Sequence, residues 1–424
     1  MNFRECLENE NKRGSLQVVS EKSNPNLEVA IQINETEPAP VLFEDVNGLR
    51  VAGNLFANRE SYARHLNIPQ ETFLHTLHAK LSAGDVQLEK RDGIYGEIEL
   101  SEVDLSKLPI LYHYQGDGGP YITAGVWIVN DPQFGPNMSY HRMMITGNNR
   151  GTVRVVENRG TFNALQHSNG VAEAAICIGA PPAVLLAASC SPDPGINEME
   201  LAARLDEVTL VKCKTVDLWV PDSSEIVIEG RFVNETGDEG PFVDITGTWD
   251  HIRQQPVFEV SRIAMREDAI YHALVPGRGE HQILMGMPKE IDILREVNNV
   301  CRCLDVSITP GGSAWLHAVV QIEKTKASDG KAALEAAFRA HKSLKHCVVV
   351  DSDINIHDPH DVEWAIATRL QADRDMMILS DQPSSSLDPS ATHIPGKKSR
   401  AAKMGMDATI KASGEEKKMF YRVR

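Results

Sequence analysis

The chain has 424 residues, of which 42% are hydrophobic and 24% charged, a composition typical of a globular protein with two or three domains. Its formal net charge of −16 excludes a general nucleic-acid binder, which would need a basic face. No run of eighteen apolar residues occurs, and the first residues lack the apolar core of a signal peptide. The seven cysteines are scattered, with no CxxC pair. These features predict a cytoplasmic protein with reduced thiols and no membrane partner.

The region up to residue 108 mixes strands and helices. Alternating apolar residues predict strands over 27–33 and 40–46, and apolar residues at helical spacing predict a helix over 70–83.

From residue 122 to about residue 276, short strand patterns follow one another, separated by Gly, Pro and Asn-Asp turns. This series of short strands favours a barrel or sandwich over parallel βαβ units. One helix is expected within it, over 198–205. The expected strands span 125–130, 140–146, 152–157, 175–179, 183–188, 209–214, 225–233, 257–265 and 270–275.

After residue 286, helical patterns return and alternate with apolar strands, which predicts an α/β domain. Near its end a polar, mobile segment is expected over 383–398. The helices expected in this region span 288–300, 332–343 and 361–370, and the strands span 315–322 and 347–351.

Two acids, Glu239 and Asp244, flank a Gly-Pro pair and two apolar residues in the stretch 238–247. The Gly-Pro pair breaks regular structure, so the two carboxylates need not follow helical or strand periodicity. Burial of Phe242 and Val243 would draw Asp244 into a dry environment, where the pKa of a carboxylate rises and suits a general acid. The alternative is a surface turn with solvated acids.

A second stretch, residues 137–160, predicts a hairpin around an Asn-Gly-rich turn and carries four arginines. In an acidic protein such a cluster indicates an anionic partner, because guanidinium groups match phosphates and carboxylates; ordinary surface salt bridges are the alternative. Asn137 and Glu198 offer hard oxygen ligands that suit Mn²⁺ or Mg²⁺. His281, in a glycine-rich turn, is predicted to be structural. The arginines are Arg142, Arg150, Arg154 and Arg159.

Several longer motifs occur in a defined order between about residues 108 and 411. They include Asn137-(x4)-Arg142, Arg159-Gly160, Val211-Lys212-Cys213, Glu239-Gly240-Pro241-Phe242-(x)-Asp244-(x2)-Gly247, Arg266-Glu267-Asp268, Trp364-Ala365-Ile366 and Lys403-Met404-Gly405-Met406-Asp407. In this the chain resembles the UbiD-type decarboxylases. The resemblance implies an α+β, multidomain fold: an N-terminal α/β domain (1–108), a central β-rich split-barrel flavin-binding domain (109–298) and a C-terminal α/β oligomerisation domain (299–424).

The cofactor of this family is prenylated FMN, bound through Mn²⁺, with K⁺ as a further cation. The resemblance implies that Arg142 orients the substrate carboxylate, Glu239 pairs with Arg142, and Asp244 donates a proton after CO₂ leaves. The metal-ligand positions correspond to Asn137, Glu198 and Asn158, the last standing where the family often has His. The residues implied to line the cofactor are Tyr140, His141, Arg142, Arg154, Val155, Val156, Arg159 and Gly160.

The sequence of residues 284–290 resembles sequences of the archaeal branch of the family. An archaeal member decarboxylates trans-anhydromevalonate 5-phosphate to isopentenyl phosphate in a modified mevalonate pathway, which feeds isoprenoid biosynthesis. We therefore expect a non-oxidative carboxy-lyase acting on this unsaturated acid. The alternatives are 4-hydroxybenzoate-type aromatic acids as substrates and, from another class, a non-catalytic flavin-binding subunit. The resemblance also implies a homo-oligomer and a flavin prenyltransferase that supplies the cofactor.

Overall fold

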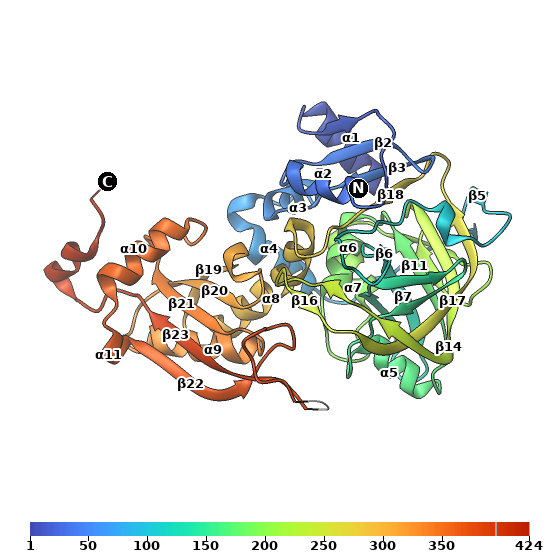
Figure 1. The fold of residues 1–424 in the computed structure, drawn as a ribbon. Helices are drawn as coiled ribbons and strands as arrows, with labels where there is room; N and C mark the ends of the chain where they lie inside the picture. Colours follow the sequence, from blue (N-terminus) through green and yellow to red (C-terminus); the bar gives the residue numbers. More distant parts are fainter. Residues whose placement is uncertain (395–396, 424) are drawn as a thin grey trace. The chain divides into compact units, whose positions relative to one another are not determined.

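The structure is a computed structural model and describes residues 1–394 and 397–423 (Figure 1). The chain forms two compact units. Unit 1 comprises Met1–Phe73 and Ala79–Leu284, and unit 2 comprises Leu74–His78 and the chain from Met285 onward. Helices and strands are mixed in both units, which confirms the predicted α+β, multidomain class.

Unit 1 begins with a small mixed sheet of four strands in the order β1-β2-β3-β18. The pairs β1–β2 and β3–β18 are parallel, and β2–β3 is an antiparallel hairpin, so β18 returns to this sheet after the whole central region. The strands are β1 (Gln17–Val19), β2 (Val41–Val46), β3 (Leu49–Gly53) and β18 (Ile270–His272), and the same unit contains the helices α1 (Phe3–Lys12), α2 (Glu28–Thr36) and α3 (Arg59–His65). Helix α4 (Phe73–Leu81) is divided between the units, with Leu74–His78 in unit 2.

Two predicted strands are wrong, because both segments are helices. Leu27 is the N-cap of α2, and residues 28–33 belong to the helix itself. Val29 and Ile33 are buried one helical turn apart in the core, so the apolar residues that seemed to alternate form one face of a helix. Residues 183–188 lie within α6 (Pro182–Ser189), which has a proline in its first turn. Every residue of α6 up to Ala188 is buried, and a continuous apolar run carries no period that separates a buried strand from a buried helix.

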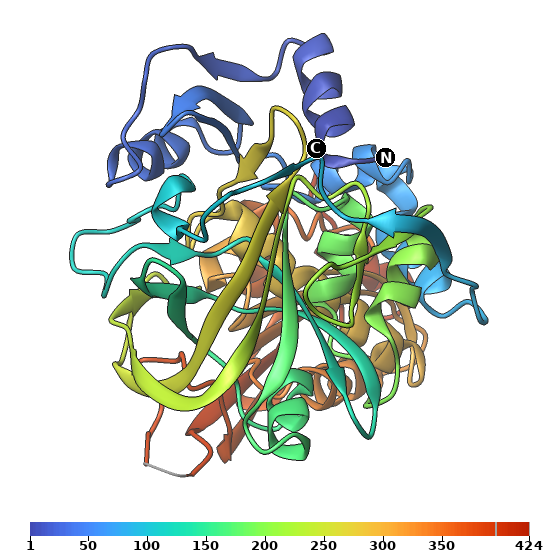
Figure 2. The ribbon, with the colours of Figure 1, turned by 90° about the vertical axis from the view of Figure 1, so that its right-hand side faces the viewer.

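The central sheet of unit 1 has nine strands, and all their pairings are antiparallel. Eight follow the order β6-β9-β10-β17-β14-β11-β7-β8, and β5 (Ile98–Glu99) pairs with β17. Figure 2 shows β14 and β17 as long curved ribbons side by side. The strands are β6 (Tyr121–Ile122), β7 (Val126–Asp131), β8 (Gly135–Tyr140), β9 (Met143–Gly147), β10 (Arg150–Val153), β11 (Ala172–Ile178), β14 (Ile226–Glu239) and β17 (Arg253–Met265).

The β-rich centre is therefore confirmed, but a split barrel is not. The strand order ends at β6 and β8, and no described residue pairs these two strands. Within the predicted strand 140–146 the chain breaks between β8 and β9, and the predicted strand 152–157 ends at Val153. The predicted hairpin is present as β9 and β10, joined by the Asn-Gly-rich turn.

The remaining elements of unit 1 lie around the central sheet. The helix predicted over 198–205 is α7 (Glu198–Leu205). A short hairpin follows β14 and is formed by β15 (Phe242–Val243) and β16 (Trp249–Asp250). The others are α5 (Gly160–His167) and a three-stranded sheet of β13 (Trp219–Pro221), β12 (Thr209–Lys212) and β4 (Glu89–Ile94).

The core of the central sheet is organised around Trp127 on β7, whose side chain is fully buried. Its ring lies 5.6 Å from that of Phe232 on β14 and 4.9 Å from that of Phe258 on β17. Buried aromatic rings in contact across strands contribute more than their area alone, so this cluster stabilises the centre of the sheet. The indole N–H of Trp127 donates to the backbone carbonyl of His141 at 2.9 Å, which ties the core to the break between β8 and β9.

Unit 2 is an α/β structure, as predicted. Its sheet has the order β19-β20-β21-β23-β22, with parallel pairing between β20, β21 and β23 and antiparallel edge strands. The strands are β19 (Arg302–Ile308), β20 (His317–Glu323), β21 (His346–Asp351), β22 (Met376–Pro383) and β23 (Arg400–Asp407), and the helices are α9 (Asp329–Ala340), α10 (Pro359–Arg369), α11 (Ala372–Asp375) and the part of α8 (Gly279–Asn298) from Met285 onward.

Helix α8 starts nine residues before the predicted helix 288–300, since Pro288 is accommodated inside it instead of opening it. Of the predicted polar segment 383–398, residues 395 and 396 lie outside the described residues. In the described part of the chain no helix is long and apolar enough to cross a lipid bilayer.

Candidate active site

Arg142 lies in the gap between β8 and β9, next to His141. The backbone is held on both sides of this gap. Trp127 binds the carbonyl of His141, and the N–H of Arg154 donates to the carbonyl of Arg142 at 3.0 Å. The break releases Arg142 from the alternation of the sheet, while core and neighbouring strand keep its backbone in place.

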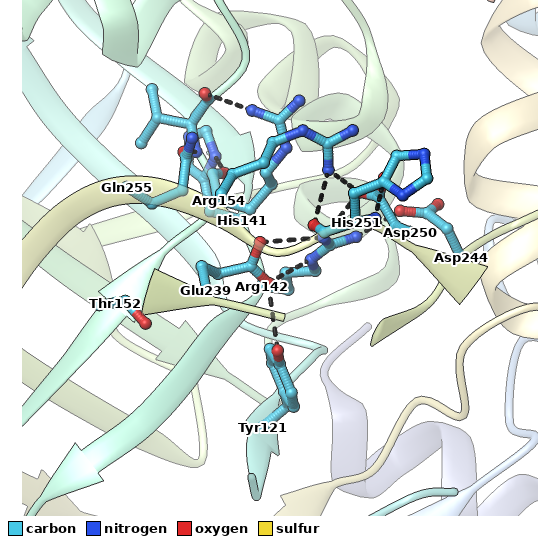
Figure 3. A network of polar contacts seen from close by, with 12 residues as sticks. Tyr121, His141, Arg142, Thr152, Arg154, Glu239, Asp244, Asp250, His251 and Gln255 are labelled. Atoms are coloured by element: carbon cyan, nitrogen blue, oxygen red, sulfur yellow. Dashed lines mark hydrogen bonds and ion pairs between the residues drawn. The ribbon is translucent and has the colours of Figure 1, made fainter. Parts of the chain in front are cut away.

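The guanidinium of Arg142 contacts both acids of the stretch 238–247 (Figure 3). Glu239, at the end of β14, accepts from Nε at 2.8 Å and from Nη2 at 3.0 Å, a bidentate pair. Asp244, just after β15, accepts from Nη1. The Glu239 side chain is fully buried, whereas that of Asp244 is 14% exposed. The acids are therefore not a solvated surface turn.

A third carboxylate, Asp250, also binds Arg142, and sequence reasoning missed it. Its Oδ2 accepts from Nη2 of Arg142 at 2.9 Å and from Nη1 of Arg253 at 2.5 Å. The pairing of β15 with β16 places Asp250 opposite Phe242, on the strand that returns after the turn. No spacing rule in the sequence signals this, because the turn length decides where the returning strand aligns.

Two aromatic side chains close the other side of the cluster. The hydroxyl of Tyr121 donates to Oε1 of Glu239 at 3.2 Å. The ring of Phe242 lies 4.3 Å from Cζ of Arg142 and 4.6 Å from the ring of Tyr121. The ring of Phe242 therefore places an aromatic face against the cation.

The charges of the cluster stabilise one another against burial. Burial would lower the pKa of Arg142, but its hydrogen bond to Glu239 and the charge of Asp244 raise that pKa above its ordinary value. Burial would raise the pKa of Asp250, but its hydrogen bond to Arg253 and the charge of Arg142 hold that pKa below its ordinary value. Arg142 and Asp250 are therefore charged at neutral pH.

The predicted metal ligands Asn137 and Glu198 lie together. Nδ2 of Asn137 donates to Oε1 of Glu198 at 2.9 Å, and the backbone N–H of Met138 donates to Oε2 at 2.8 Å. Glu198 opens α7, whose N-terminus is capped by the side chain of Asn197. Burial raises the pKa of Glu198 to about 7.

The third predicted ligand, Asn158, is exposed in the loop before α5, with φ of 60°. Its place in a metal shell stays a prediction. Within residues 1–394 and 397–423, no group of three or more His, Cys, Asp or Glu side chains could hold a metal ion. A cation at Glu198 would therefore draw on amide oxygens, a donor set that suits Mn²⁺ or Mg²⁺ better than zinc.

Gly160 lets α5 approach β8. A Cβ at this position would lie 2.4 Å from the side-chain atoms of Asn137, so a larger residue would displace that amide. The next residue, Thr161, contacts Nε2 of His141 at 2.8 Å. Nδ1 of His141 lies 3.0 Å from the carbonyl of Arg154, so Nδ1 carries the proton and Nε2 accepts from the Thr161 hydroxyl. Burial lowers the pKa of His141 to about 4, which keeps the ring neutral.

The four arginines of the hairpin region have different partners. Arg150 forms surface salt bridges with Glu235 and Glu259. Arg154 is half-buried, donates to the carbonyl of Val155 at 2.9 Å, and pairs with no carboxylate among the described residues. Burial and the charges of Arg253 and Arg142 lower the pKa of Arg154.

The other predicted cofactor-lining residues differ in exposure. Tyr140 is half-buried, and its buried hydroxyl has no partner in the described chain. Val155 is buried, whereas Val156 and Arg159 are exposed.

Known proteins are similar to this chain over most of its length. Residues 7–81, 88–279 and 282–408 match the N-terminal, Rift-related and C-terminal domains of 3-octaprenyl-4-hydroxybenzoate carboxy-lyase, the UbiD domains. Among curated relatives, two anhydromevalonate phosphate decarboxylases are each 40% identical. That of Methanocaldococcus jannaschii aligns over 93% of this chain and 94% of its own, and that of Methanosarcina mazei over 96% of each.

Solved structures agree. The UbiD-class enzyme HmfF from Pelotomaculum thermopropionicum, in complex with FMN, superposes with a TM-score of 0.95 at 36% identity, covering 100% of this chain and 97% of that one. An evolved dimeric form of HmfF, in complex with prenylated FMN, gives a TM-score of 0.90 at 34% identity, covering 100% and 96%.

Proposed function

The chain belongs to the UbiD family of carboxy-lyases, and from this membership we propose that it decarboxylates trans-anhydromevalonate 5-phosphate to isopentenyl phosphate with prenylated FMN as cofactor. Support for the substrate comes from relatives of that name that are 40% identical over at least 93% of the chain. Support for the cofactor comes from the similar structures with FMN and prenylated FMN. The observation that carries the proposal is the buried Arg142, held between Glu239 and Asp244.

The residues present fit such a cofactor. The close approach of Gly160 to Asn137 suits an anionic group beside the hairpin, and so does the Arg154 guanidinium, which pairs with no carboxylate in the described part of the chain. Asn137 and Glu198 would hold Mn²⁺, with Asn158 as third ligand and K⁺ as a further cation. When bound, prenylated FMN accepts the electron pair that remains when CO₂ departs. The residues that would line it are Tyr140, His141, Arg142, Arg154, Val155, Val156, Arg159 and Gly160.

Arg142 would bind and orient the substrate carboxylate. All three of its nitrogens are occupied by carboxylates, so one partner must give way to the substrate. Asp244 is the most exposed of the three, at 14% against 0% for Glu239, and is the one that can do so. Glu239 would keep Arg142 in place through its bidentate pair, while Asp244, once protonated, would give its proton to the carbon that has lost CO₂.

The test uses protein co-produced with a flavin prenyltransferase, the proposed supplier of the cofactor. The absorbance of the purified protein reports bound prenylated flavin. The holo-protein is then incubated separately with trans-anhydromevalonate 5-phosphate and with 4-hydroxybenzoate, and product is followed. We expect isopentenyl phosphate and CO₂ from the first acid only. Turnover of the aromatic acid alone would disprove the substrate assignment, and a flavin-loaded protein that releases no CO₂ from either acid would be a binding subunit.

We also propose the domain limits 1–108, 109–298 and 299–424, a cytoplasmic location, and a homo-oligomer that assembles through the C-terminal domain. Size-exclusion chromatography with light scattering tests the last point. A mass of 46.8 kDa at micromolar concentration would be that of a monomer and would contradict it.

A further inference from the structure

Arg142 binds a third carboxylate, Asp250, in addition to Glu239 and Asp244 of the stretch 238–247. Asp250 is only 6% exposed, and it shares its Oδ2 between Arg142 and Arg253, while its Oδ1 accepts from the backbone N–H of His251 at 2.9 Å. A buried carboxylate with three donors is firmly held. Asp250 is therefore a fixed negative charge on the guanidinium that would bind substrate.

Asp250 matters when Asp244 is protonated, because Arg142 then loses one of its negatively charged partners. If Asp244 takes up a proton, it no longer balances the charge of Arg142. Glu239 and Asp250 still contact the guanidinium, so no buried cation is left unpaired. Because of Asp250, Arg142 keeps two carboxylate partners, and not Glu239 alone, when Asp244 is protonated. Like charges close to one another disfavour the ionised form of a carboxyl group, so the charge of Asp250 also favours protonated Asp244.

We propose that Asp250, with Arg253, is a positioning pair that sets the proton affinity of Asp244 and holds Arg142 while Asp244 is protonated. This rests on the proposed role of Asp244 as proton donor. The proton cycle balances: protonated Asp244 gives its proton to the substrate carbon, returns as a carboxylate to Arg142, and is reloaded from water.

Other titratable groups face the same cluster. Burial raises the pKa of Asp117 to about 6, and the charge of Arg142 opposes this rise. Tyr121 donates to Glu239, and Arg154 lies close enough to Arg253 for their charges to interact. His281, at the start of α8, interacts with the charges of Asp244 and Arg142, and burial lowers its pKa. All of these stay unchanged in the variants below, so their effects cancel in the comparison.

The pair allows a test with two opposite signs. Asp250→Asn removes a negative charge from the guanidinium that Asp244 shares, and should therefore favour the ionised form of Asp244. The fall in kcat at high pH, where Asp244 loses its proton, then moves to lower pH. Arg253→Met removes a positive charge and should move that fall to higher pH, and Arg253→Lys should restore the wild-type profile. At a pH below the fall, Asp250→Asn should recover kcat to within about threefold of wild type.

A purely structural role would lower kcat equally at every pH and would not change sign between the two variants. Asp131→Asn is the matched control, because Asp131 is a buried carboxylate that pairs with His167 away from Arg142. Its pH profile should coincide with that of wild type. Profiles of Asp250→Asn and Arg253→Met that shift together, or not at all, would overturn the proposal.

A second measurement separates this inference from the proposed function. The C=O stretch of protonated Asp244 can be followed by infrared difference titration of the cofactor-free protein and assigned by its loss in Asp244→Asn. We expect its midpoint to fall in Asp250→Asn and to rise in Arg253→Met. If the holo-protein releases no CO₂ but these midpoints shift, the proposed function fails and the electrostatic coupling stands. Unshifted midpoints refute the coupling, whatever the activity.

Discussion

Asp244 and Glu239 bind the same guanidinium, yet only Asp244 reaches solvent. This difference gives each side chain a separate task at the residue scale. The fully buried Glu239 holds Arg142 through its bidentate pair and is closed to solvent. Asp244 also binds Arg142 but is open to solvent, which suits the donor role proposed for it.

Asp244→Asn should therefore retain the cofactor and lose turnover. An amide can accept from Arg142 but cannot donate a proton to carbon at a useful rate, and loss of general acid catalysis typically costs about 10²- to 10⁴-fold. Flavin absorbance of the purified variant measures cofactor binding, and product formation measures kcat. Normal turnover would remove Asp244 from the donor role.

Arg142→Lys should damage both substrate binding and kcat, because a lysine cannot form the bidentate pair with Glu239 or bind a second carboxylate in the same plane. We expect kcat/KM to fall by about 10²-fold or more, since orientation of the substrate contributes strongly to such reactions. Arg150→Lys is the matched control, because Arg150 forms only surface salt bridges, and its kinetics should equal those of wild type. An active Arg142→Lys enzyme would show that the guanidinium geometry is not required.

At the scale of elements, the site is assembled from ends and breaks of strands. Arg142 follows β8, Glu239 ends β14, and Asp250 ends β16, so three strand termini meet at one cluster. The proposed metal ligands lie at element ends in the same way, with Asn137 on β8 and Glu198 as the first residue of α7. The termini of these elements therefore affect function as well as stability.

The cap of α7 gives a prediction at this scale. Asn197→Ala removes the side-chain acceptor for Met199 N–H and should lower the free energy of unfolding by about 1 kcal/mol. It should also reduce Mn²⁺ and flavin retention, because Glu198 follows the cap directly. Asn58→Ala removes the equivalent cap of α3, where the Asn58 side chain accepts from Ser61, and should cost similar stability with unchanged cofactor content. Equal flavin loss in both variants would show that α7 has no special role.

At the scale of the whole molecule, buried histidines predict acid sensitivity. Burial lowers the pKa of His113 to about 3, and no described residue hydrogen-bonds its ring. In the unfolded chain this imidazole has an ordinary pKa of about 6.5. The contribution of neutral His113 is thus fully present above about pH 6.5 and is lost as the pH falls toward 3, because the unfolded state then binds the extra proton.

Between pH 6.5 and pH 5, this single group should cost about 2 kcal/mol of the free energy of unfolding. His113→Leu removes the titration and should flatten the fall in stability over this range relative to wild type. Chemical denaturation at pH 7.5 and pH 5 measures both slopes. Parallel slopes would mean that His113 is hydrated in the folded protein. Glu198, whose pKa burial raises, acts in the opposite direction in both proteins and does not affect the difference.

The sequence by itself determined the family, the mixed α+β class and two of the three acids that bind Arg142, Glu239 and Asp244. Ordered motifs consist of residues close in sequence, so they can be recognised without knowing how the chain packs. Helix α7 was also predicted correctly, because its N-cap and amphipathic face are local signals. The predicted strands at 27–33 and 183–188 were wrong, because short apolar segments take their conformation from burial and not from period.

Only the tertiary structure decided that Asp250 binds both Arg142 and Arg253, since their approach depends on the register of β16 with β15 and of β17 with β14. The same holds for the contrast between Asp244 and Glu239. Exposure is a property of packing, and two carboxylates five residues apart have no difference in the sequence that would assign one to the interior. Register and burial arise from contacts between distant segments, which local spacing does not encode.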